Sequence, residues 1–233
     1  MRPGTRPPTV RHVLAAVLAA SLFPASVAGR GRQAGEDPFF STDEPARLTL
    51  ETDLSAIEAG RLARDDPPFR PGTLRHLGPG EDTVTRTVEV RRRGNSRRYL
   101  CDFPPLLIRF SDRPPGGPVF GDHEALYHVG HCQNRMPGFD AHALKEYLAY
   151  RLWAGVAEIA LRARPARITY LDTGGDVGAG TRWAFLVEDR SRLARRSGGS
   201  FVDDPASVEP GRVPVREATL LAVFQYMIGN TDW

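Results

Sequence analysis

The chain has 233 residues, of which 41% are hydrophobic and 25% are charged, so its length suits one large domain or two small lobes. It carries 31 lysine and arginine residues against 28 acidic residues, a formal net charge of +3. Residues 1–28 contribute three arginines and no acid, so 28 of each sign remain in the rest of the chain. The basic excess belongs to the N-terminal segment and does not by itself argue for nucleic acid, which we do not expect as a partner.

The first 28 residues have the features of a secretory signal peptide. Three arginines precede a short apolar run from Val13 to Phe23, and small residues at Ser26 and Ala28 suit cleavage after Ala28. The run is too short to span a bilayer comfortably. We therefore expect an exported protein, periplasmic or extracellular, with no stable membrane span after cleavage. A retained N-terminal anchor is the alternative.

Short strands and turns are predicted for the first half of the remaining chain. A polar linker at residues 29–45 precedes an alternating strand at Leu48–Thr52. Asp53 is expected to cap a short helix that continues through Leu62. The proline- and glycine-rich segment between residues 66 and 72 predicts a loop. Alternating and apolar patterns predict further strands at Thr83–Arg91, Leu106–Phe110 and Glu124–Val129.

The second half contains the clearest helical pattern. Over residues 141–161, apolar side chains recur every fourth residue on one face, and Pro165 is expected to end the helix. The apolar side chains are Leu144, Leu148, Leu152 and Val156. A hairpin of Ile168–Leu171 and Trp183–Val187 and a last helix at about residues 216–228 follow. This order predicts an α+β fold with a sheet-rich first lobe.

Cys101 and Cys132 are the only cysteines, and in an exported protein they are a natural disulfide pair. Two buried free thiols are the alternative. Four histidines lie near Cys132, at positions 123, 128, 131 and 142. Zinc prefers such ligands, but the spacing matches no standard zinc finger, so a metal-binding protein is a minor hypothesis.

The chain ends on an apolar helix followed by Gly229, Asn230, Thr231, Asp232 and Trp233. The turn presents one carboxylate, Asp232, as catalytic or metal-binding turns do. The residues leave two interpretations open. The chain is a fragment that stops inside its own active site, or it ends in a buried helix with an Asn-Thr-Asp cap.

Several segments, in this order, resemble an exported bacterial family related to the spore-coat CotH kinases, and more distantly the HipA-like and secretory-pathway kinases. The Arg-Gly-Asn segment at residues 93–95 and the Gly-Asn-Thr-Asp-Trp segment at 229–233 are moderately specific, and the order of the segments along the chain matters more than either alone. The matching segments span about residues 45–233 and are Val90–Arg98, Cys101–Leu106, Val129–Cys132, Leu144–Leu152, Ala184–Asp189 and Tyr226–Trp233.

The resemblance implies an α+β fold: a protein-kinase-like N-terminal lobe, built of an antiparallel sheet, one long helix and a hairpin, with only the start of a helical C-lobe. The signal peptide at 1–28 and the linker at 29–45 would precede the N-lobe at 46–189, and residues 190–233 would hold the hinge and the start of the truncated C-lobe. The implied function is phosphorylation of a hydroxyl on an envelope or secreted protein acceptor, with ATP and Mg²⁺.

The resemblance also implies roles for single residues. Asp232 would orient or deprotonate the acceptor hydroxyl, Glu146 would steady the cation on the phosphates, and Glu188 would lie in the hinge that binds the nucleotide. Tyr127 stands where the family commonly has a lysine, and Arg109 is the candidate substitute, although a guanidinium is not equivalent to an ammonium. Because a second lobe is missing, we expect this chain alone not to turn over ATP. A non-catalytic, pseudokinase-like binding module of the cell envelope is the alternative.

Overall fold

The computed structural model describes residues 37–60, 67–78, 82–111, 119–136, 138–175, 177, 180–204 and 207–230. Three predictions fall outside these residues: the signal peptide, its cleavage after Ala28, and the catalytic role of Asp232. They stay predictions.

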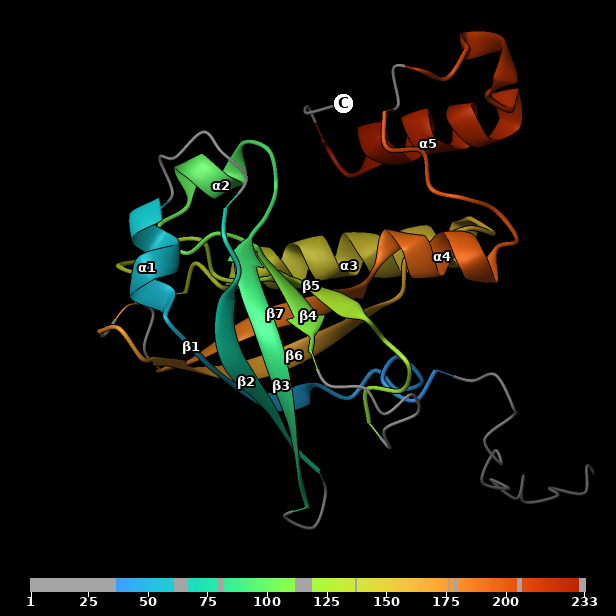
Figure 1. Cartoon of the computed structure of the whole chain (residues 1–233). Helices are drawn as coiled ribbons and strands as arrows, with labels where there is room; N and C mark the ends of the chain where they lie inside the picture. The colour runs from blue at the N-terminus through green and yellow to red at the C-terminus, as the bar shows by residue number, and fades with distance from the viewer. Residues whose placement is uncertain are drawn as a thin grey trace, which may run out of the picture. The chain divides into compact units, whose positions relative to one another are not determined.

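Within the described residues, seven strands form a closed barrel (Figure 1). The order around the barrel is β1, β2, β3, β4, β5, β7 and β6, and neighbouring strands are antiparallel except for β1 and β6, which are parallel. The strands are β1 Ala46–Thr52, β2 Arg70–Leu77, β3 Thr83–Arg92, β4 Leu106–Phe110, β5 Ala125–Val129, β6 Ala163–Asp172 and β7 Gly180–Glu188.

The core lies inside the barrel, because alternate residues of each strand point inward. In β1, for example, Ala46, Leu48 and Leu50 are buried while Arg47 is exposed. The alternation seen in the sequence is therefore the inside–outside pattern of a barrel wall. Fully buried core residues from other strands include Leu74, Val88, Val90, Ile108, Leu126, Ile168 and Leu186.

This closed barrel shows that the expected fold, a protein-kinase-like N-terminal lobe of an antiparallel sheet, one long helix and a hairpin, is wrong. The parallel pairing of β1 with β6 closes the sheet, and β2 occupies part of the segment that was predicted to be a loop. Gly72 explains why residues 70–72, predicted to be a loop, belong to strand β2. A Cβ atom at this position would lie 2.5 Å from the carbonyl oxygen of Glu51, so a glycine is needed for β2 to approach β1. The Pro-Gly pair marks a close strand contact instead of a loop.

The helices lie outside the barrel wall. Figure 1 shows α3 beside the barrel, and α5 beyond α3 on the side away from the strands. No helix in the described part of the chain is both long and apolar enough to cross a membrane. The helices are α1 Leu54–Ala59, α2 Arg97–Leu100, α3 Ala141–Val156, α4 Arg190–Arg196 and α5 Val215–Met227.

The face of α3 that packs on β6 and β7 is not its leucine face. Tyr147 and Tyr150 contact the ring of Phe185 on β7, with ring centroids 6.0 Å and 5.5 Å apart. The leucine face points away, so that Leu148 and Leu152 are 57% and 54% exposed. The helix also ends at Val156, five residues earlier than predicted, and Pro165 lies within β6.

The predicted disulfide between Cys101 and Cys132 is present. It joins the segment before β4 to the segment after β5, and the backbone N–H of Phe103 donates to the carbonyl of Cys132 at 2.9 Å beside it. Both contacts hold the α2 segment against the end of the barrel.

Candidate functional site

A pocket of about 760 Å³ lies between α3 and α5. Its other walls are residues 159–161, which lead into β6, and Leu193 of α4. The rings of Trp153 and Phe224 meet at a centroid distance of 5.1 Å, so an aromatic contact joins the two helices. Apolar side chains dominate the lining, among them Leu148, Leu152, Leu161, Leu221 and Ile228. The exposed leucine face of α3 is therefore one wall of this pocket.

Few charged groups line the pocket. Arg97 and Glu146 form an ion pair at 2.7 Å, so they largely neutralise each other. Lys145, the only lysine of the chain, forms no ion pair with any described residue. The amides of Gln225 and Asn230 are hydrogen-bonded to each other at 2.7 Å. The pocket thus combines an apolar wall with one cation that the described carboxylates do not neutralise.

Tyr127, which stands where the family commonly has a lysine, takes part in contacts that support the fold. The guanidinium of Arg93 lies 4.0 Å from the centroid of the Tyr127 ring, and the Tyr127 hydroxyl donates to Asp189 at 3.0 Å. Burial raises the pKa of Tyr127, and the neighbouring Asp189 raises it further. Tyr127 is therefore a neutral phenol that supports Arg93 and positions the residue before α4.

The residues expected to bind the nucleotide do not come together. Arg109 on β4 pairs with Glu89 on β3 at 2.7 Å and stacks on the ring of Phe69 at 3.8 Å. Glu146 pairs with Arg97 instead. The cation–carboxylate pair that the resemblance implies for Arg109 and Glu146 is therefore not formed.

Glu188 is fully buried and has a structural environment. Its carboxylate accepts the backbone N–H of Arg162 at 2.7 Å and the Nε–H of Arg196 at 3.2 Å. These donors occupy the carboxylate that was expected to contact a nucleotide. Glu188 instead joins the end of β7 to the start of β6 and to α4.

In the described part of the chain, Arg109, Glu146 and Glu188 each pair with other side chains of the protein. Among the described residues, no group of three or more His, Cys, Asp or Glu side chains could hold a metal ion. Binding of ATP and Mg²⁺ stays a prediction. The histidine cluster is used otherwise: His128 Nε2 is 2.6 Å from the Tyr170 hydroxyl, and His131 Nε2 is 2.9 Å from the Asn134 side-chain oxygen. Cys132 is held in the disulfide. The minor hypothesis of a zinc site gains no support.

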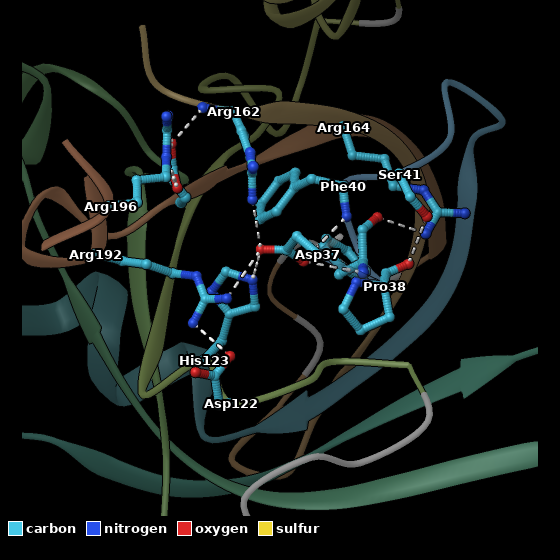
Figure 2. Close-up of polar contacts among 12 residues, drawn as sticks. Asp37, Pro38, Phe40, Ser41, Asp122, His123, Arg162, Arg164, Arg192 and Arg196 are labelled. Carbon is cyan, nitrogen blue, oxygen red and sulfur yellow. Dashed lines mark hydrogen bonds and ion pairs between the residues drawn. The ribbon is translucent and has the colours of Figure 1, made fainter. Parts of the chain in front are cut away.

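A buried charge cluster that the sequence did not reveal surrounds Asp37 (Figure 2). The Asp37 side chain is 2% exposed, and its Oδ2 lies 2.8 Å from His123 Nε2 and 3.3 Å from guanidinium nitrogens of both Arg162 and Arg192. Its Oδ1 accepts the backbone N–H groups of Phe39 at 3.1 Å and of the next residue at 3.3 Å. The segment was expected to be a linker. Its two consecutive phenylalanines were the signal that it packs.

The charges around Asp37 keep it ionised. Burial alone raises the pKa of a carboxyl group, but the hydrogen bond and charge of His123 and the charge of Arg192 outweigh this effect and lower the pKa of Asp37 to about 2. Arg192 also pairs with Asp122 at 2.5 Å. The cluster therefore ties the N-terminal segment, the segment before β5 and α4 together.

No protein-family model matches the chain, and no match to a curated protein was found. The resemblance to CotH-related kinases stays a prediction, and functional proposals depend on the residues of the chain itself.

Proposed function

We propose that this protein is a non-catalytic binding module whose ligand occupies the pocket between α3 and α5. The observation that carries the proposal is the pocket itself. Pockets that bind small ligands have volumes of roughly 300–1,000 Å³, mostly apolar walls and a few polar groups. The pocket here has about 760 Å³ and this kind of lining.

The lining favours an anionic amphiphile as the ligand. The leucines of α3 and the ring of Trp153 suit an aliphatic or aromatic body. Lys145 suits a single phosphate or carboxylate head, because Glu146 is already paired with Arg97. The Arg97–Glu146 ion pair and the Gln225–Asn230 hydrogen bond already use much of the polar lining, so the pocket would offer few hydrogen bonds to a larger polar ligand.

Calorimetric titration with decyl phosphate and with uncharged decanol, both below their aggregation limits, tests this proposal. We expect saturable binding of one decyl phosphate per chain. Replacing the cation by Lys145→Gln should weaken decyl phosphate binding roughly two- to fivefold, the strength of an exposed ion pair, and leave decanol binding unchanged. Arg195→Gln, an exposed change outside the pocket lining, is the matched control. Absence of saturable binding by the unaltered chain would refute the proposal.

We further propose that the module works outside the cytoplasm, in the cell envelope or beyond. The Cys101–Cys132 disulfide supports this location, since disulfides persist in oxidising compartments. N-terminal sequencing of the protein recovered from an exporting host should begin at residue 29. A mature protein that begins at Met1 would contradict cleavage after Ala28.

Phosphoryl transfer from ATP with Mg²⁺ is the second candidate function. One local observation favours it: Asn230 lines the pocket, and Asp232 follows two residues later in the sequence. Transfer of labelled phosphate to an envelope or secreted protein acceptor, compared with an Asp232→Ala control, tests it. ATP binding that requires Mg²⁺ would favour the kinase over the amphiphile-binding module, and its absence would favour the module.

A further inference from the structure

Two arginines of the Asp37 cluster are direct sequence neighbours of residues that line the pocket. Arg162 follows Leu161, and Arg192 precedes Leu193. Both guanidinium groups lie 3.3 Å from the same atom, Asp37 Oδ2, as the dashed lines in Figure 2 show. One carboxylate from the N-terminal segment thus holds two walls of the pocket that are far apart in the sequence.

Further contacts join these two walls to each other. Arg196 of α4 donates to the carbonyl oxygen of Ala160, which also lines the pocket. Arg196 and the backbone N–H of Arg162 share the carboxylate of Glu188. The wall at residues 159–161 and the wall at α4 are therefore parts of one ion-pair network, and Asp37 is its contribution from the N-terminal segment.

The position of Asp37 is set by packing at the end of the barrel. Phe39 is fully buried, stacks on Phe120 at a centroid distance of 5.3 Å, and accepts a hydrogen bond from Arg164 at its carbonyl. Phe40 meets the ring of His123 edge-on at 5.2 Å. Residues 37–40, which we name the strap, are thereby docked on the barrel by two aromatic side chains.

We infer that the strap sets the shape of the pocket, with Asp37 as the positioning residue for both walls. When the strap is docked, Asp37 holds Leu161 and Leu193 toward the pocket through Arg162 and Arg192. When the carboxylate is lost, the guanidinium groups of Arg162 and Arg192, which are 37% and 17% exposed, lose their shared partner, and both walls move. The effect on ligand affinity rests on the proposed function, whereas the movement of the walls does not require any ligand.

Hydrogen exchange of the full chain without ligand tests the inference directly. In Asp37→Asn, which keeps the side-chain shape but removes the charge, we expect faster exchange in residues 159–162 and in α4. The matched control is Asp172→Asn, because Asp172 accepts the backbone N–H groups of Leu54 and Ser55 at the start of α1. The control should loosen α1 and leave the pocket walls as they are. Unchanged exchange of the walls in Asp37→Asn, or equal loosening of the walls in the control, would overturn the inference.

Two single arginine variants distinguish the positioning of the pocket walls from a general loss of stability. They also replace Asp37→Asn in the test if that variant fails to fold. Arg192→Gln should speed exchange in α4 more than in residues 159–162, and Arg162→Gln should do the reverse. A merely structural role would loosen both walls equally in both variants, which would overturn the inference.

Affinity measurements complete the test. Decyl phosphate should bind Asp37→Asn at least about threefold more weakly than the unaltered chain at a temperature well below unfolding. If decyl phosphate fails to bind the unaltered chain, the proposed function fails, and the exchange experiment alone decides on the strap. If the walls loosen and the affinity stays the same, the strap positions the walls as inferred and the pocket is not the binding site.

Discussion

The guanidinium of Arg93 lies over the Tyr127 ring, 4.0 Å from its centroid, while the hydroxyl of the same tyrosine donates to Asp189 at 3.0 Å. The Tyr127 side chain thus holds a half-buried cation on its ring face and contacts the start of α4 with its hydroxyl. Partial burial lowers the pKa of Arg93 because desolvation disfavours the charged guanidinium, and the Tyr127 ring provides a compensating attraction.

Tyr127→Lys should therefore destabilise the protein. It removes the ring under Arg93 and places an ammonium beside a guanidinium, at an expected cost of about 3 kcal/mol in the free energy of unfolding. Tyr127→Phe keeps the ring and loses only the hydroxyl bond, so we expect a loss of about 1 kcal/mol. Urea denaturation of both variants measures the difference. A lysine variant that is as stable as the natural chain and gains Mg²⁺-dependent ATP binding would favour the kinase instead.

A pair of glycine substitutions tests the closed barrel. Gly72→Ala would place a Cβ atom 2.5 Å from the Glu51 carbonyl oxygen and 2.9 Å from the Thr52 Cβ, so β1 and β2 must separate. We expect a loss of about 2 kcal/mol or more. Gly155→Ala in α3 meets no atom within 4 Å and should stabilise by up to about 1 kcal/mol. Thermal unfolding compares the two, and a neutral Gly72→Ala would indicate that residues 70–72 form a loop after all.

The local patterns of the sequence predicted much of the secondary structure, but they did not predict that the strands close into a barrel. Period-two alternation identified β1 and β3, because it depends on neighbouring residues only. The pairing of β1 with β6 joins Ala46 to Ala166, and no local pattern reports such a distant partner. For α3, the sequence showed the stripe of leucines correctly, but it did not show that the face with Tyr147 and Tyr150 would pack on the barrel.

The candidate site was predictable to a similar degree. Glu146 was singled out, and it lines the pocket. Its partner could not be derived, because Glu146 pairs with Arg97 across 49 positions of the sequence. The Asp37 cluster was missed for the same reason, since it joins residues 86 and 125 positions apart.

Loss of the disulfide should lower stability without changing the fold. The bridge joins residues 31 positions apart. Closing a loop of this size in the unfolded chain is worth about 3.7 kcal/mol in the chain-entropy model. We expect the double variant Cys101→Ala, Cys132→Ala to lose roughly this amount in urea denaturation, and reduction of the natural chain to have the same effect. Equal stability of the oxidised and reduced chains would contradict the prediction.

The stability contributed by Asp37 should depend on pH in a defined window. The pKa of Asp37 is lowered from 3.8 to about 2 in the fold, so between these values the unfolded chain binds more protons than the folded chain. The stabilisation is therefore fully present above about pH 5 and is lost as the pH falls through about 2. From the size of the shift, it amounts to about 2 kcal/mol at neutral pH.

Asp37→Asn removes this contribution, so the variant should be less stable than the natural chain at pH 7 and should approach it as the pH falls from 5 toward 2. The measurement is urea denaturation of both chains at several pH values. The effect of Asp172, whose pKa is also lowered and which lies outside the Asp37 cluster, cancels in the comparison. Asp122 shares Arg192 with Asp37, so its effect belongs to the difference between the two chains. A difference in unfolding free energy that stays constant from pH 7 to pH 2 would show that Asp37 does not contribute through its charge.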